Sequence, residues 1–267
     1  MVALSFLQPT KRRCLVLNKL VKFSAVVTLA IAGSSVLADG HDKDQPYPTF
    51  GIETFACNYN EGKDLGDLLK VSEKWSQWAT ETLDTPYSAW LFTPMFFDNA
   101  PEFDVYWLGS SDSMVTLGAV QDQWIKTGAK YQKEFNKVMT CDRHTMFEGQ
   151  TLRFNLDSLA SGNAQFFGCN FKEGATPEKF LTGTKAFRAF VDTLELKEGI
   201  WRWWPSAGHL NQPPWDFLEV VGSASLEERF ANKGKYDDSN GDAVWYENNS
   251  DNMQCAYVAD ANYIQVK

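Results

Sequence analysis

The sequence predicts an α+β fold made of two tandem repeats, each with the order strand, helix, strand, strand, helix, strand. Three observations support this prediction. A segment around Cys57 recurs around Cys169, similar patterns of strands and helices follow both segments, and each half ends in a strand with a second cysteine. Self-similarity at a fixed spacing is the signature of a repeated structural unit.

The recurring segment sets the spacing of the repeat. FACNYNEG at residues 55–62 and FGCNFKEG at residues 167–174 share Phe, Cys, Asn, Glu and Gly at an offset of 112 residues. Each segment is expected to form the first strand of its repeat and to lead into a helix. Asp64 can cap the first helix. Thr176 can cap the second, with Pro177 at the first helical position.

The remaining elements follow in the same order in both halves. Two strands around a turn are predicted at residues 87–97 and 103–109, and again at residues 200–204 and 215–221. A helix is expected from about Ser113 to Val138. Its counterpart after Ser225 is expected to end near Phe230, because Gly234 and a polar stretch interrupt the helical pattern.

This element order describes a ferredoxin-like sandwich, in which two helices cover one face of four antiparallel strands. Two such units can bury their remaining faces together. The arrangement resembles the dimeric α/β-barrel superfamily, here as two tandem ferredoxin-like βαββαβ repeats forming a pseudo-dimeric α/β barrel. Two independent sandwiches joined by residues 150–163 are the alternative. The expected organisation is a signal peptide at 1–38, a flexible tail at 39–50, and α+β repeats at 51–152 and 163–267.

Four cysteines remain after removal of the predicted signal peptide, and they lie on the first and last strands of the repeats. These two strands are neighbours in a ferredoxin-like sheet, so disulfides Cys57–Cys141 and Cys169–Cys255 are predicted. Pairing of the equivalent cysteines of the two halves is the alternative. No CxxC motif or histidine cluster accompanies them, so no metal site is predicted.

The N-terminal region predicts export. Residues 1–22 hold five basic residues and no acidic ones, and the apolar run Phe23–Ala38 follows. A basic segment followed by a short apolar run that ends in small residues is typical of a secretory signal. A retained N-terminal anchor is the alternative. The pair Arg12-Arg13 is compatible with export by the twin-arginine route as well as by the general secretory route. A periplasmic or secreted protein is expected, without stable membrane insertion after signal removal.

Charge limits the partners of the mature chain. Subtracting the five basic residues of the signal from 25 leaves 20 basic against 34 acidic residues, a net charge of −14. Such a chain repels phosphate backbones, so no nucleic-acid partner is expected. A monomeric pseudo-dimer is the favoured assembly. No motif for a cofactor occurs, so none is predicted.

Candidate site residues follow from strand alternation. If Cys57 bonds Cys141, then Asn58 and His144 project together from the opposite face, with Asp142 on the same side. His144 is the candidate acid or base, and the structural alternative is an ordinary surface histidine. The candidate ligand-binding residues are Asn170, Trp90, Trp203, Arg202 and His209.

Two functions fit these observations. The first is an exported small-molecule-binding or interaction protein with an aromatic-lined cavity. The barrel resemblance implies the alternative. This is an enzyme of the cofactor-independent oxygenase, isomerase, lyase or haem-handling kind, acting on an apolar or aromatic small molecule. Fold analogy alone does not decide between them.

Overall fold

A computed structural model describes residues 47–97, 99–209 and 213–267, so the predicted signal peptide and most of the predicted tail lie outside the described residues. The first half contains β1 (Thr49–Tyr59), α1 (Leu65–Thr82), β2 (Ser88–Pro94), β3 (Val105–Ser111), α2 (Met114–Thr127), α3 (Ala129–Phe135) and β4 (Met139–Phe154). The second half contains β5 (Ser161–Phe171), α4 (Pro177–Thr193), β6 (Gly199–Pro205), β7 (Phe217–Ser223), α5 (Leu226–Asp238), α6 (Gly241–Asn249) and β8 (Met253–Gln265).

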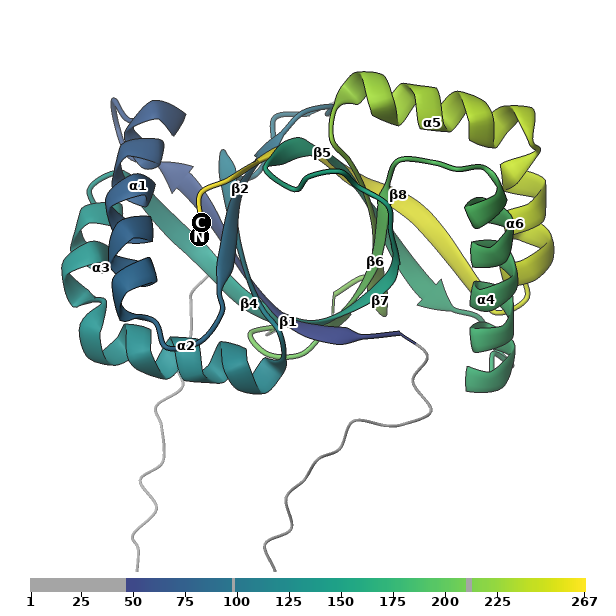
Figure 1. Ribbon diagram of the computed structural model, residues 1–267, viewed down its shortest axis with the longest axis horizontal. Coiled ribbons are helices and arrows are strands. Elements are labelled where there is room, and N and C mark those ends of the chain that lie inside the picture. The colour runs from purple at the N-terminus through teal and green to yellow at the C-terminus, as the bar shows by residue number, and fades with distance from the viewer. Residues whose placement is uncertain (1–46, 98, 210–212) are drawn as a thin grey trace, which may run out of the picture. The chain divides into compact units, whose positions relative to one another are not determined.

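All eight strands close into one antiparallel barrel in the order β1-β3-β2-β8-β5-β7-β6-β4. Figure 1 shows this ring nearly end-on, with α1, α2 and α3 outside one side and α4, α5 and α6 outside the other. Each half contributes its strands in an equivalent order, and the pairs β2–β8 and β4–β6 join the halves. The alternative of two independent sandwiches is therefore wrong.

Side-chain alternation along the strands separates an interior core from two outer cores. The interior cluster draws residues from all eight strands and none from a helix; it includes Ile52, Phe92, Phe147, Trp203 and Tyr263. A second cluster packs the first-half strands against α1, α2 and α3. The second half covers its outer face with two smaller clusters under α4 and α6.

The first and last strands of each half pair directly at their cysteines. Cys57 lies opposite Cys141 and Cys169 opposite Cys255, and the structure contains both disulfides, each with an S–S distance of 2.06 Å. The two disulfides leave no free thiol among the four cysteines of the described residues.

The predicted helix starts are confirmed, because Asp64 and Thr176 accept hydrogen bonds from backbone N–H groups three residues on. The predicted early end of the last helical segment is wrong. α5 continues through the exposed Gly234, and the break before α6 falls at Asn240, whose φ is +54°. In the first half, the single helix expected up to Val138 is divided into α2 and α3. No helix among the described residues is both long enough and apolar enough to span a bilayer.

Candidate functional site

A pocket of about 80 Å³ lies between the first-half helices and the outer face of the barrel. We call it the helix–sheet pocket; its lining includes Glu53, Phe55, Trp75, Trp78, Trp107 and Trp124. The volume has room for about five to eight water-sized groups. The pocket therefore suits a small molecule with mostly apolar surface.

Glu53 is the buried carboxylate in the wall of this pocket. It lies in the middle of β1, and its side chain is only 3% exposed. Its Oε1 accepts a hydrogen bond from the Tyr87 hydroxyl at 2.6 Å, and its Oε2 accepts one from Gln121 Nε2 at 2.7 Å. The Nε2 of His144 lies 2.9 Å from the same Oε2. A buried carboxylate is costly without such partners, and here they come from three separate parts of the first half.

His144 lies beside Glu53 because of a bulge in β4. The bulge falls between Ala56 and Cys57 of β1, and on β4 it leaves Asp142 as the extra residue. His144 therefore lies opposite Phe55, and the two rings stack with their centroids 3.8 Å apart. The imidazole side chain is 42% exposed, so it contacts both the buried carboxylate and solvent.

This bulge corrects the predicted grouping of Asn58, Asp142 and His144. The extra residue shifts the alternation of β4 by one, which moves His144 to the face that carries Phe55 and Cys57. Asn58 instead accepts a hydrogen bond from the backbone N–H of Asp104 at 3.2 Å. Asp142 is exposed at the bulge. The structure thus brings His144 to a carboxylate, but the carboxylate is Glu53.

Tyr87 links the carboxylate to the aromatic wall. Its hydroxyl donates to Glu53 and accepts a hydrogen bond from Trp107 Nε1 at 3.1 Å. Burial raises the pKa of Tyr87 well above its ordinary value, and the nearby Glu53 charge raises it further. The phenol therefore stays a neutral donor. Gly109 makes room for it, since a Cβ at this position would overlap the Tyr87 hydroxyl.

The second half does not repeat this network. Strand pairing places Gln165, Glu198 and Glu219 at the positions of Glu53, Tyr87 and Trp107. None of these three replacements preserves the chemistry of its first-half equivalent, so the hydrogen-bond network around Glu53 belongs to the first half only.

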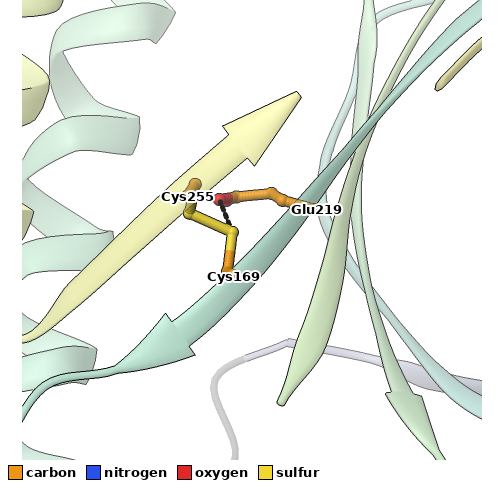
Figure 2. Close-up of side chains that lie close together, drawn as sticks. All are labelled: Cys169, Glu219 and Cys255. Atoms are coloured by element: carbon orange, nitrogen blue, oxygen red, sulfur yellow. Dashed lines mark hydrogen bonds between the residues drawn. A yellow bond between two sulfur atoms is a disulfide. The ribbon is translucent and has the colours of Figure 1, made fainter. Parts of the chain in front are cut away.

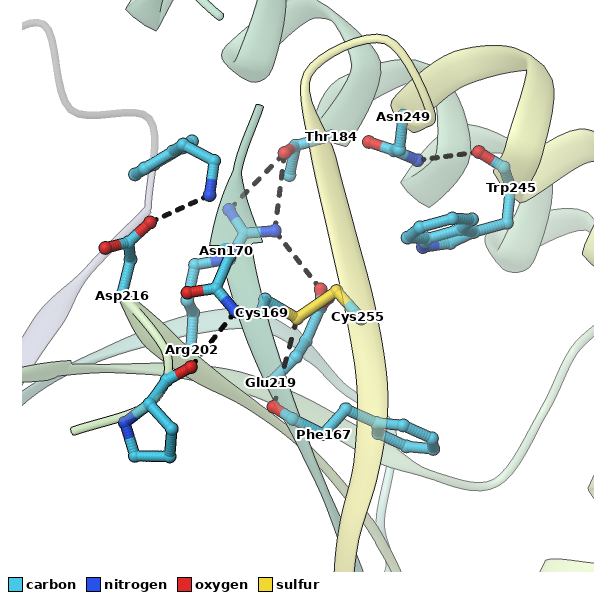
Figure 3. Close-up of a disulfide and its surroundings, with 12 residues drawn as sticks. Phe167, Cys169, Asn170, Thr184, Arg202, Asp216, Glu219, Trp245, Asn249 and Cys255 are labelled. Carbon is cyan, nitrogen blue, oxygen red and sulfur yellow. Dashed lines mark hydrogen bonds and ion pairs between the residues drawn. A yellow bond between two sulfur atoms is a disulfide. The ribbon is translucent and has the colours of Figure 1, made fainter. Parts of the chain in front are cut away.

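Arg202 lies in the corresponding layer of the second half, between the outer face of the barrel and α4. Its side chain is 2% exposed, and its guanidinium lies 3.1 Å from Glu219 Oε1 and 3.3 Å from the Thr184 hydroxyl, as Figure 3 shows. It also stacks over the rings of Phe180 and Phe217. Arg202 was predicted to bind a ligand. Its guanidinium is enclosed and ion-paired with Glu219, and only its Nε has no hydrogen-bond partner among the described residues.

A carboxylate also lies beside the second disulfide. Figure 2 shows Glu219 directed at the Cys169–Cys255 bridge, with its Oε2 4.0 Å from Cys169 Sγ. Metal ions bind cysteine as the thiolate, and both sulfurs here are held in a covalent bond to each other. These three residues therefore do not fit a metal centre.

The other predicted ligand residues are divided between loops and the barrel interior. Asn170 donates to the carbonyl of Pro214 at 3.2 Å, which ties the end of β5 to a loop. His209 packs against the ring of Phe147, with Nε2 3.2 Å from the Met146 carbonyl. These side chains do not line the helix–sheet pocket.

Trp90 and Trp203 line a different cavity, of about 440 Å³, inside the barrel. Sequence reasoning missed Glu53, Tyr87 and Gln121. The signal that could have found Glu53 is a lone carboxylate within the otherwise uncharged strand TFGIETFACNY.

The barrel of eight strands with helices outside both halves has the architecture of the dimeric α/β-barrel superfamily. A solved structure of a proposed monooxygenase from Lactobacillus acidophilus is similar, with a TM-score of 0.51, 11% identity, and coverage of 82% of this chain and 95% of that one. At this identity the likeness concerns the fold. No family model and no curated protein matches the sequence.

Two further structures are similar at lower TM-scores. A proposed chlorite dismutase has a TM-score of 0.47 and 10% identity, covering 81% of this chain and 95% of that one. A haem-binding protein from Thermus thermophilus has a TM-score of 0.44 and 10% identity, covering 82% and 93%.

Proposed function

We propose that this protein is an enzyme that transfers protons to and from a small, mostly apolar molecule bound in the helix–sheet pocket. The observation that carries the proposal is Glu53, a 3%-exposed carboxylate held by Tyr87, Gln121 and His144 in an aromatic wall. Buried titratable groups with defined partners in a pocket are typical of catalytic sites. The reaction class is isomerisation or elimination, in which a proton leaves one atom of the substrate.

Glu53 and His144 have different roles in this proposal. Glu53 lines the pocket, so its carboxylate is the group that contacts the substrate and accepts the proton. His144 contacts Glu53 from the solvent side and connects the site with bulk water. Tyr87 and Gln121 fix the orientation of the carboxylate, which is the usual contribution of groups that hydrogen-bond a catalytic base.

One of the similar structures is a haem-binding protein, which raises the possibility of haem in this chain. The helix–sheet pocket does not fit haem. The pocket holds about 80 Å³, whereas cofactor-sized ligands occupy cavities of about 300–1,000 Å³. No step of the proposed reaction depends on haem.

Deuterium exchange into small ketones tests the proposal directly. The purified protein is incubated in D₂O with butanone and cyclopentanone, and loss of the α-proton signals is followed by NMR. Wild-type protein is expected to accelerate exchange. Glu53→Gln is expected to lower the rate by about 10²–10⁴-fold, the usual contribution of a general base. His144→Asn, which removes the solvent link, is expected to cause a smaller loss.

Glu148→Gln is the matched control, because Glu148 is an exposed carboxylate of β4. Its exchange rate should equal that of the wild type. If the rate stays at the wild-type level in Glu53→Gln, the proton-transfer function is excluded, provided that circular dichroism shows the variant folded.

Binding without chemistry is the second candidate function. The aromatic surface provided by Trp75, Trp78 and Trp124 favours it, because stacking surfaces of this kind bind apolar molecules without any catalytic group. The two candidates separate in the exchange assay. A ligand-binding protein would bind cyclopentanone, seen as shifted indole resonances, and would leave its α-proton exchange unchanged.

We also infer that the chain is an exported product of tandem duplication, and that it acts as a monomer with repeats at 51–152 and 163–267. The equivalent strand order of the two halves supports the duplication. Two disulfides suit an oxidising compartment such as the periplasm. N-terminal sequencing of the protein from the periplasm should begin at Asp39. An N-terminus that retains residues 1–38 would contradict export by a cleaved signal.

A further inference from the structure

We propose that the barrel interior is a second binding site, which takes a neutral aromatic molecule bearing a hydrogen-bond acceptor. This site is separate from the helix–sheet pocket, since the wall of strands lies between them. We call it the barrel chamber. It has a volume of about 440 Å³ and a lining that includes Ile52, Trp90, Phe92, Trp201, Trp203 and Tyr263.

The chamber is open at one end and filled at the other. At the open end Trp90 and Trp201 are half-buried, and Phe154 is 53% exposed with its ring 6.3 Å from that of Trp201. At the filled end Phe147, nearer the start of β4, packs against the rings of Trp203 and Trp215. A ligand would therefore enter beside Phe154 and stop above Phe147.

Trp203 gives the chamber its polar recognition point. The residue is 7% exposed, and its indole N–H has no hydrogen-bond partner among the described residues. A buried donor without a partner costs about 1–3 kcal/mol, so such groups are rare in folded proteins. By contrast, Trp90 Nε1 in the same chamber donates to the Leu159 carbonyl at 2.8 Å. In our proposal, an acceptor atom of the ligand is the partner that this N–H of Trp203 lacks.

The charge of the lining limits the ligand further. Among the described residues around the chamber, Asp112 is the one charged side chain, and it is exposed. No basic side chain of this lining could balance an anion, and the deep wall is aromatic and aliphatic. An uncharged ring system with a carbonyl or ether oxygen meets these conditions. The volume lies within the range of about 300–1,000 Å³ found for drug-sized ligands.

Fluorescence titration with the neutral naphthyl ketone prodan tests the proposal. Prodan is expected to bind the wild type with a blue-shifted emission. Ala164→Phe fills the chamber with a ring and should weaken binding by about tenfold or more, whereas Val258→Phe adds the same ring on the exposed surface of β8 and should not. Ser110→Phe, nearer the mouth, replaces Ala164→Phe if that variant does not fold.

Trp203→Phe tests the polar contact separately. It should weaken prodan binding by about five- to tenfold, the effect of one hydrogen bond. It should leave the affinity for 2-(dimethylamino)naphthalene, which lacks the ketone, about unchanged. Equal losses for both compounds would exclude the proposed contact.

The NMR resonance of the Trp203 indole N–H gives the position of the ligand, with Trp203→Phe providing its assignment. Prodan should shift this resonance and leave that of Trp124, in the helix–sheet pocket, unchanged. Absence of binding, or a shift of the Trp124 resonance alone, would overturn the chamber proposal. Neither result bears on proton exchange by Glu53, so the two proposals fail separately.

Discussion

Replacing Glu198 with glutamine is expected to abolish a loss of stability that the wild type suffers as pH rises. Glu198 precedes β6 and is 7% exposed. Burial raises the pKa of its carboxyl from 4.5 to about 7, and the neighbouring Arg153 guanidinium offsets only part of this rise. The Tyr236 phenol also faces it, and the Glu198 charge contributes to raising the pKa of that phenol. Ionising Glu198 in the folded protein is therefore unfavourable.

The magnitude follows from the difference between the folded and unfolded pKa values. Each tenfold change in proton affinity is worth about 1.4 kcal/mol, so a rise from 4.5 to about 7 corresponds to about 3 kcal/mol. Because the folded state holds the proton more tightly, this stabilisation is complete below pH 4.5 and disappears as pH rises through 7. The Glu198→Gln variant keeps a neutral side chain throughout. It should match the wild type near pH 4 and exceed its stability by up to about 3 kcal/mol near pH 8.

Urea unfolding followed by tryptophan fluorescence at a series of pH values measures this difference. Glu247→Gln, at an exposed position of α6, is the control for a change in net charge. Its stability curve should run parallel to that of the wild type. Parallel curves for Glu198→Gln and the wild type across the whole range would refute the reasoning.

Three further outcomes are expected. Arg202→Met should lower the free energy of unfolding, measured in urea, by about 3–5 kcal/mol, because the Glu219 carboxylate, only 14% exposed, loses its partner. Adding Glu219→Leu should restore most of this loss. A single variant as stable as the wild type would argue against an unpaired charge. Gly109→Ala should displace the Tyr87 hydroxyl and cost about 1–3 kcal/mol, with loss of ketone exchange; a crystal structure with Tyr87 in place would contradict this. Reducing both disulfides should lower the urea midpoint, since each bridge contributes about 2–4 kcal/mol.

Much of the fold could be predicted from local patterns. Capping residues such as Asp64 and Thr176 mark helix starts through their own backbone hydrogen bonds, so they can be recognised without tertiary information. The cysteines indicated which strands are neighbours. The end of α5 could not be predicted in this way. Gly234 is exposed within that helix and weakens it only slightly, whereas the left-handed Asn240 that ends the segment gives a weaker sequence signal.

The site was only partly predictable, and the reason is geometric. His144 was identified as the candidate acid or base, but its partners were assigned by strict alternation. One bulged residue, Asp142, reverses that alternation, so the partner of His144 is Glu53 and not Asn58. A bulge depends on the pairing of two distant strands, which residue spacing within one strand does not report. Gln121 approaches from α2, whose position on the sheet is set by packing.

The joining of β8 to β2 makes the strand Met253–Gln265 essential to closure of the barrel. Before Met253–Gln265 are synthesised, β2 and β5 each lack a neighbour and expose unpaired backbone groups. A polypeptide without β8 would expose the unpaired edges of β2 and β5, and copies of it could associate through these edges. Closure of the ring therefore requires β8, which favours a nascent chain that stays unfolded until this strand has been synthesised.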